Sequence, residues 1–364
     1  MSVTSSPYAS LPKIELHTHL EGTIRAATLL SLAKRNGQAL PADSVEGLAE
    51  LYRFEDFPHF LEVWQLTTNC LRTAQDFAQV VVDYAAEAAS CGAVYLEGIF
   101  SPAERVATGV SWDAVFNGYC DGAQQAEEDH GVTVRLTPDI HWGIDPAEAS
   151  EVARRAVAMR EWGAVGLGVG GAEGAVPPRT YAKAFAIARD GGLGSVPHAG
   201  EAAGPECVRA VVEVLGAHRV RHGIRAVEDP ALLAELARRG TVLDVCPTSN
   251  LRTRVVKRIE DHPLPSLMAA GVRCSVSTDD PAMFGTNLAH EYELAADLGV
   301  SLREVYGAAV SGALCDEDTR ARLSHIEEQA SWDPVVRWPA GDSVGIGDDG
   351  SFSRAALLDP EVRF

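Results

Sequence analysis

Eight short apolar runs alternate with longer stretches of helical character along this 364-residue chain. In the longer stretches, apolar residues recur at three- and four-residue spacing, which is typical of helices that pack one face on a sheet. The predicted strands are Ile14–His19, Ala93–Phe100, Val132–Ile140, Ala164–Gly170, Gly194–His198, Val220–Gly223, Thr241–Val245 and Arg273–Thr278. Predicted helices between them include Phe77–Ala89, Glu148–Trp162, Tyr181–Arg189, Cys207–Leu215 and Pro230–Arg238. Strands that alternate with helices pair in parallel, and eight such units predict an α/β fold, the closed (β/α)8 or TIM barrel.

A doubly wound open sheet is the alternative architecture, and it is disfavoured because no G-x-G-x-x-G turn opens the first predicted helix. The segment Ala27–Arg72 is longer than one crossover helix needs, so we expect extra helices after the first strand, near the barrel mouth. Its aromatic residues are predicted to pack locally, with a lid over the site as the alternative; they are Phe54, Phe57, Phe60 and Trp64. We expect one (β/α)8 domain over residues 12–335, an N-terminal tail over 1–11, and a tail rich in Gly, Asp and Ser over 336–364.

The composition excludes several classes of partner. A formal net charge of −20 opposes binding to nucleic acids and to anionic membranes. No apolar stretch reaches the length of about 18 residues that a membrane span needs, and the N-terminus lacks the basic and apolar regions of a signal peptide. The seven cysteines are widely spaced without a C-x-x-C pair, which indicates reduced thiols and a cytoplasmic protein.

His17 and His19 stand two residues apart at the end of the first predicted strand. Residues i and i+2 of a strand point to the same face, so both imidazoles can reach one metal ion. Imidazole is a good ligand for zinc and for its neighbours in the first transition series. The pair therefore predicts one part of a metal site.

Three further polar fragments end other predicted strands. They contain His198 with Glu201 after the fifth strand, His222 in the sixth, and Asp279 with Asp280 after the eighth. Each fragment alone is weak, because a lone strand-end histidine is usually structural and an Asp-Asp-Pro sequence is usually a turn. Active sites of (β/α)8 barrels collect at these strand ends, so the fragments together predict one catalytic site.

The predicted metal ligands are His17, His19, His198 and Asp279, three imidazoles and a hard carboxylate. That set suits a catalytic zinc ion with one position open to water, whose pKa then falls to about 7. A single ion per chain is expected, because the fourth strand offers no lysine that could bridge a second one. The P-C-x-x-C signature of cytidine-deaminase sites is also missing.

The neighbouring residues have predicted catalytic roles. His222 would lie beside the hydroxide as a base or an electrostatic partner, and Glu201 would donate a proton to the substrate. Asp280 adjoins the ligand Asp279 and could hold a ring nitrogen of the substrate. The glycine-rich run at 166–174 is weak as a phosphate cradle, since no Lys-Ser/Thr pair follows it. Close backbone packing and contact of the Gly171 backbone with the edge of a planar ligand both remain open for that run.

The motifs resemble those of the adenosine deaminase family of the amidohydrolase superfamily, from Leu11 to about Ala330. The motifs that carry the resemblance are Pro12–Gly22, Phe100–Pro102, His198–Pro205, His222–Gly223, Cys246–Asn250 and Ser277–Pro281. The resemblance implies zinc on the four predicted ligands and a metal-dependent aminohydrolase that acts on a 6-aminopurine. It implies that Glu201 protonates N1, that His222 and Asp280 activate and orient the hydroxide that attacks C6, and that the Gly171 backbone contacts N3.

Three departures from the family pattern bear on the substrate. Glu21 stands where adenosine deaminases usually carry Asp against the ribose 5′-hydroxyl, Ile99 replaces an arginine, and Ala172 replaces an acid. The first two together favour a 5′-modified adenine nucleoside, with aminodeoxyfutalosine of the futalosine route to menaquinone as the named candidate, ahead of adenosine and then free adenine. An inactive nucleoside-binding relative is disfavoured because ligands, acid and base are all present. A hydrolase of esters, lactams or phosphotriesters is disfavoured by the missing fourth-strand lysine and by the His-x-x-Glu arrangement.

Overall fold

The computed structural model describes residues 6–53 and 57–332, apart from the side chains of residues 57, 58, 60 and 61. The predicted tail at 336–364 lies outside the described residues, as do residues 1–5, Phe54 and the side chains of Phe57 and Phe60. Residues 7–11 of the predicted N-terminal tail form turns against the barrel, where Lys13 Nζ donates to the carbonyl of Leu11 at 2.8 Å.

The strands form two parallel sheets that follow chain order. The first sheet has the order β1-β2-β3-β4-β5 and the second β6-β7-β8-β9. Their bounds are β1 Lys13–His19, β2 Ala93–Phe100, β3 Thr133–His141, β4 Gly166–Gly170, β5 Gly194–Ser195, β6 His198–Ala199, β7 Arg219–His222, β8 Val242–Val245 and β9 Arg273–Val276. Seven of the eight predicted strands agree with these bounds within two residues at each end, and the fifth is divided into β5 and β6.

The division of the fifth strand has a local cause at Pro197, which has no N–H to donate to a ladder. Pairing nevertheless continues across the gap. Val196 donates its N–H to the Leu167 carbonyl at 3.0 Å, and Arg221 donates to the Pro197 carbonyl at 2.9 Å. Residues 194–199 therefore occupy one strand position between β4 and β7, as predicted.

The two outer strand positions close on each other. Asp279, just after β9, donates its N–H to the His17 carbonyl at 3.0 Å, and His19 donates to the Asp279 carbonyl at 2.8 Å. This parallel bridge joins the last strand to the first, so the sheet is a closed barrel. The predicted (β/α)8 fold is confirmed.

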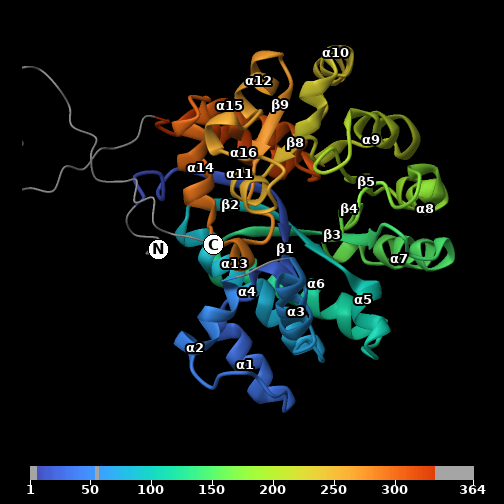
Figure 1. Cartoon of the computed structure of the whole chain (residues 1–364), viewed down its shortest axis with the longest axis vertical. Coiled ribbons are helices and arrows are strands. Elements are labelled where there is room, and N and C mark those ends of the chain that lie inside the picture. Colours follow the sequence, from blue (N-terminus) through green and yellow to red (C-terminus); the bar gives the residue numbers. More distant parts are fainter. Residues whose placement is uncertain (1–5, 54–56, 333–364) are drawn as a thin grey trace, which may run out of the picture.

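The helices surround the strands (Figure 1). Their bounds are α1 Ala26–Asn36, α2 Val45–Ala49, α3 Phe57–Thr68, α4 Ala74–Ser90, α5 Pro102–Ala107, α6 Trp112–His130, α7 Pro146–Ala158, α8 Ala182–Asp190, α9 Pro205–Ala210, α10 Pro230–Arg239, α11 Pro247–Arg252, α12 Leu264–Ala269, α13 Pro281–Phe284, α14 Leu288–Asp297, α15 Leu302–Gly312 and α16 Glu317–Gln329. The predicted extra helices after the first strand are α1, α2 and α3, which lie together on one side of the barrel in Figure 1. Over the part of the chain that the structure describes, no helix is both long enough and apolar enough to cross a membrane.

The interior of the barrel holds paired charges. Arg219 is fully buried and binds the Glu97 and Asp244 carboxylates, each at 2.8 Å. Arg221 lies beside it in β7 and binds Asp139 at 2.5 Å. Removing one member of such a buried pair leaves an uncompensated charge and costs about 3–5 kcal/mol. The site at the strand ends therefore lies on a fixed, charge-paired layer.

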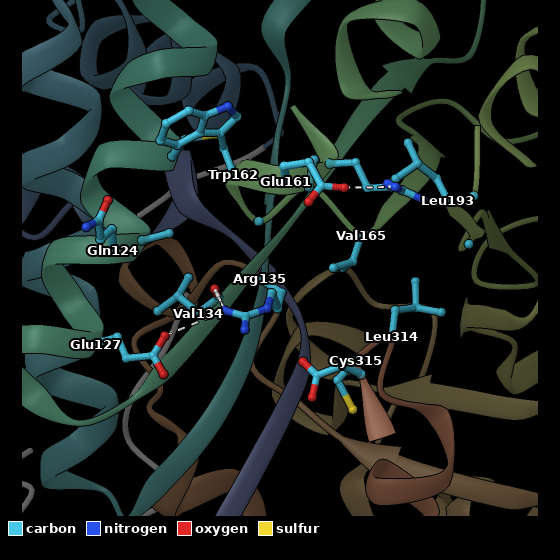
Figure 2. A pocket seen from close by; sticks show the side chains of 18 of the residues that line it. Gln124, Glu127, Val134, Arg135, Glu161, Trp162, Val165, Leu193, Leu314 and Cys315 are labelled. Carbon is cyan, nitrogen blue, oxygen red and sulfur yellow. Dashed lines mark hydrogen bonds and ion pairs between the residues drawn. The ribbon is translucent and has the colours of Figure 1, made fainter. Parts of the chain in front are cut away.

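Figure 2 shows a hollow at the opposite end of the barrel, where the strands begin. Val134, Val165 and Leu193 lie at the starts of three successive strand positions and line it. Its labelled charges include Glu127 and Arg135, which pair with each other at 3.7 Å. None of the predicted site residues lines this hollow, so the predicted chemistry belongs to the other end of the strands.

Candidate active site

The four predicted metal ligands converge at the carboxyl ends of the strands. The Nε2 atom of His198 lies 3.0 Å from that of His17 and 3.2 Å from that of His19. The Oδ1 atom of Asp279 lies 3.2 Å from His17 Nε2 and 3.3 Å from His19 Nε2. Residues from three distant parts of the chain therefore point four ligand atoms at one centre.

This arrangement fits a first-row divalent metal ion. An ion with tetrahedral arms of about 2.0–2.1 Å has ligand atoms about 3.3–3.4 Å apart. The second ring nitrogens are already used, because His17 Nδ1 lies 3.2 Å from the Asp244 carbonyl and His198 Nδ1 lies 2.9 Å from the Val169 carbonyl. Hydrogen bonds at Nδ1 hold each ring with a bare Nε2 toward the centre, which is the tautomer that a metal needs.

The electrostatics agree with a ligand set. Burial lowers the pKa of His17 well below its ordinary value and that of His198 to about 4, so both imidazoles are neutral at neutral pH. Although burial lowers the pKa of His19, the carboxylates of Asp280 and Asp279 raise it to about 9. Burial opposes ionisation of Asp279, but its contacts with His17 and His19 hold its pKa well below the ordinary value. The ionised carboxylate and the neutral rings of His17 and His198 are in the protonation states that bind a cation. His19 would lose its proton when a cation binds.

Two site residues have strained backbones. Asp279 has a φ of 65° and His222 a φ of 59°, in the left-handed region that side chains other than glycine seldom adopt. Each lies where a strand ends and the chain turns outward. Ser249 donates its hydroxyl to Asp279 Oδ2 at 2.6 Å, which holds the other oxygen toward the histidines. Such strain persists where the surroundings over-determine the conformation, and it concentrates at functional sites.

A second group, made of His17, His222 and Cys246, also has ligand atoms close together. Burial raises the pKa of Cys246 well above its ordinary value, so the side chain is a thiol and not the thiolate that metals bind. The Nδ1 atom of His222 is occupied by the Asn250 amide at 3.2 Å. The group with Asp279 is therefore the better metal site.

Glu201 and His222 face each other beside the metal ligands. Glu201 Oε2 lies 3.4 Å from His222 Nε2, and Thr253 donates its hydroxyl to Glu201 Oε1 at 3.1 Å. The His222 ring centre is 4.7 Å from that of His17. Burial raises the pKa of Glu201, with Asp279 adding to the effect, so the carboxyl keeps its proton at higher pH than an exposed glutamate. A carboxyl of this kind can serve as a general acid.

The loop that carries Glu201 is held by another carboxylate. Glu173 accepts hydrogen bonds from the backbone N–H groups of Ala203 at 2.7 Å, Ala202 at 2.9 Å and Glu201 at 3.2 Å. Three such bonds tie the end of β6 to the end of β4. Glu173 belongs to the glycine-rich run at 166–174, but the sequence assigned it no role. The contact with the Glu201 loop is visible only in the structure.

We expect Glu173→Ala to lower kcat about tenfold or more with a smaller change in metal content, because a loosened loop misplaces the proton donor. Steady-state kinetics and metal analysis check this result. Glu206→Ala is the matched control, since Glu206 is an exposed carboxylate five residues beyond Glu201. Equal kcat values for the two variants would contradict the positioning role.

Asp280 lies beside the predicted metal ligands and packs against Gly22, where a larger residue would leave no room for it. A Cβ atom on Gly22 would overlap Asp280 Oδ1, so the Asp280 side chain can take this position only because residue 22 is glycine. The Oδ1 atom is buried and has no hydrogen-bond partner among the described residues. Burial, together with Asp279, raises the pKa of Asp280 well above its ordinary value. The carboxyl is therefore placed to meet a group that enters the site.

The predicted substrate contacts lie around the same strand ends. Glu21 is buried, and its Oε1 accepts the backbone N–H of Ser101 at 2.9 Å, while Oε2 has no hydrogen-bond partner among the described residues. Burial raises the pKa of Glu21, and the nearby Arg105 lowers it in part. Gly171 follows β4 with a φ of 87° and an exposed backbone.

The sequence did not assign roles to several residues that the structure brings to the site. Ser249 and Asn250 belong to the Cys246–Asn250 motif, and that motif was the sequence feature that could have indicated them. His262 is a lone histidine outside every predicted element, and nothing in the sequence separated it from a structural residue. It contacts the Asn250 side chain at 3.2 Å.

Comparisons with known proteins identify related enzymes. The family model described as adenosine deaminase matches residues 12–329. The chain is 54% identical to an aminodeoxyfutalosine deaminase from Acidothermus cellulolyticus over 89% of this chain and 93% of the relative. It is 35% identical to an adenine deaminase from Streptomyces coelicolor, over 91% of this chain and 97% of the relative.

Solved structures give the same picture. An adenine deaminase from Arthrobacter aurescens superposes with a TM-score of 0.82 at 30% identity, covering 87% of this chain and 98% of that one. An amidohydrolase from Burkholderia ambifaria, solved with bound zinc, also gives a TM-score of 0.82, at 28% identity over 90% of this chain and 92% of that one. The match spans the barrel and all four strand ends that carry the site, and the chain belongs to the adenosine deaminase family of metal-dependent hydrolytic deaminases.

Proposed function

We propose that this protein removes the 6-amino group of aminodeoxyfutalosine by hydrolysis, with one zinc ion held by His17, His19, His198 and Asp279. The observation that supports hydrolytic deamination is the convergence of these four ligand atoms beside the Glu201 carboxyl. The substrate rests on the 54% identity with the Acidothermus cellulolyticus enzyme, against 35% with the Streptomyces coelicolor adenine deaminase.

In the proposed reaction, the oxygen of water forms a bond to C6 of the adenine ring, one proton of the water passes to Asp280, and Glu201 gives its proton to N1. The C6–N6 bond then breaks as the amino group takes the proton from Asp280 and leaves as ammonia. The C6 hydroxyl returns its proton to Glu201 and becomes the carbonyl of the 6-oxopurine, whose N1 keeps its hydrogen. The raised pKa of Glu201 supports this role, because the acid must be protonated before the substrate reacts. Its contact with His222 at 3.4 Å holds the carboxyl at the edge of the reacting centre.

The proposed zinc ion supplies activation of water at neutral pH when it is bound. The neutral imidazoles of His17 and His198, the ionised Asp279 and the ligand spacings of 3.0–3.3 Å support it. Asp280 would orient the attacking oxygen and contact the purine ring. Its Oδ1 atom, which has no hydrogen-bond partner among the described residues, is suited to both contacts. His222 would stabilise charge beside them.

Two more residues have proposed substrate contacts. Glu21 would limit the space at the 5′ end of the nucleoside, and its unpartnered Oε2 supports a contact there. The Gly171 backbone would contact purine N3 from the end of β4, where the residue is exposed. These contacts would orient the ring without adding charge at C6.

The test is ammonia release from aminodeoxyfutalosine, adenosine, 5′-methylthioadenosine and adenine under the same conditions. We expect kcat/KM for aminodeoxyfutalosine to exceed the others by about 10²-fold or more, since a site built around one polar substituent rejects analogues that lack it. A preference for adenosine would overturn the substrate. A preference for adenine, which the adenine deaminase relatives make the second candidate, would overturn it equally.

A further inference from the structure

A buried chain of hydrogen bonds lies behind His222, on the side away from Glu201. It runs from the backbone N–H of Leu264 through the His262 ring and the Asn250 amide to His222 Nδ1. The three side chains are at most 3% exposed. None of them except His222 has a role in the proposed reaction.

The first bond fixes the proton of His262. Leu264 donates its N–H to His262 Nδ1 at 3.1 Å, and a backbone N–H can only donate. The Nδ1 atom must therefore be bare, which places the ring proton on Nε2. Burial also lowers the pKa of His262 to about 4, so the ring is neutral under ordinary conditions.

The next two bonds then have only one consistent direction. His262 Nε2 lies 3.2 Å from Asn250 Oδ1, and the Nε2–H donates to that oxygen. The amide consequently turns its Nδ2 toward His222 Nδ1, also at 3.2 Å. If the Asn250 amide were flipped, its NH2 group would face the Nε2–H of His262, and two donors would oppose each other. The Leu264 N–H, which fixes the proton of His262, therefore also fixes the orientation of the Asn250 amide.

We propose that Asn250 and His262 are positioning residues that fix the tautomer of His222, with the ring proton on Nε2. An amide nitrogen only donates, so His222 Nδ1 must accept and the neutral ring carries its proton on the opposite nitrogen. That N–H faces Glu201 Oε2 at 3.4 Å and Asp279 Oδ2 at 3.8 Å. His222 thus enters the reaction as a donor that stabilises negative charge, a role that rests on the proposed function.

The tautomer itself can be read without a substrate. In metal-loaded protein labelled with ¹⁵N-histidine, two-bond ¹H–¹⁵N spectra distinguish bare from protonated ring nitrogens, and His222→Asn identifies the His222 signals. We expect a bare Nδ1 and a protonated Nε2 for His222. A protonated Nδ1 in the wild-type protein would overturn the proposal, whatever compound the enzyme deaminates.

Asn250→Asp tests the consequence, because an ionised carboxylate of the same shape accepts a hydrogen bond where the amide nitrogen donated one. We expect the His222 proton to move to Nδ1 and kcat to fall about 10²-fold or more, with KM within about threefold, as for loss of a catalytic hydrogen bond. The kinetics use whichever 6-aminopurine compound the wild type turns over. A switched tautomer with unchanged kcat would overturn the role in catalysis.

Variants of His262 give an independent test if Asn250→Asp does not fold. His262→Leu removes the donor that orients the amide, while His262→Gln keeps a nitrogen donor near the Nε2 position. We expect the first to lower kcat at least about tenfold and the second to recover most of that loss. The control is His218→Leu, because His218 Nδ1 also accepts a backbone N–H, from Ser195 at 2.9 Å, at the other end of the barrel. Equal kcat for all three variants would contradict the proposal.

Discussion

Glu201→Gln is expected to keep the metal ion and to lower kcat by about 10²–10⁴-fold, the range for loss of a general acid. Glutamine has nearly the same shape and can keep the contacts with Thr253 and His222, but it has no acidic proton for N1. The wild-type carboxyl is well suited to hold that proton, because burial raises its pKa. Removing it should therefore affect turnover far more than substrate binding.

The pH profile sharpens this prediction. Glu201 must be protonated to act, so kcat/KM should fall as pH rises through its raised pKa. Glu201→Gln should lack that alkaline limb and show a flat, low profile there. Kinetics and metal analysis on the same samples provide the measurement, with the exposed Glu206→Gln as the matched control. Near-normal kcat in Glu201→Gln would refute the assignment of the acid.

The fold could be predicted because its pattern is local. Each barrel unit carries an apolar run and a helix of its own, and seven strands were predicted within two residues at each end. The break in the fifth strand depends on Pro197, whose missing N–H interrupts one ladder position. The spacing of apolar residues does not reflect the absence of a backbone N–H at Pro197, so it predicted one continuous strand there.

The polar interior of the barrel was harder to predict. Glu97 and Asp244 stand within predicted strands, and Arg219 stands directly before one. The two carboxylates pair with the Arg219 side chain across the barrel, each at 2.8 Å. Burial of a charge depends on a partner from another strand, and partners far apart in the sequence leave no periodic signal. The network matters for the site, because Arg221 binds Asp139 at 2.5 Å and Asp139 lies 3.4 Å from the Nδ1 atom of the proposed ligand His198.

The site was predictable where chemistry requires a particular residue type at a strand end. His17, His19, His198 and Asp279 were predicted as ligands, and the structure brings their ligand atoms together. The residues that support the site were not predicted, because a hydrogen-bond acceptor such as Glu173, which holds the Glu201 loop, can be supplied from many positions. A supporting residue is defined by distance in space, and the sequence gives that distance only after the fold is known.

The metal itself gives the second large expected effect. His198→Ala and His17→Ala should each reduce the metal content from about one ion per chain to a trace and abolish turnover, because each removes an imidazole nitrogen that the ion would bind. Each substitution removes an Nε2 atom that lies within 3.0 Å of the other. Zinc added to the metal-free proteins should raise the Tm of the wild type by linkage but leave the Tm of these variants nearly unchanged.

Cys246→Ala separates the two candidate ligand groups, because His17 belongs to both while Cys246 belongs only to the group with His222. We expect this variant to keep its ion, since burial holds the thiol protonated and the Asp279 group remains whole. Elemental analysis after dialysis measures the result for all three variants. Loss of metal in Cys246→Ala with retention in His198→Ala would move the site to the other group. Two tightly bound ions per wild-type chain would refute the single-metal site, whose ligands surround one centre.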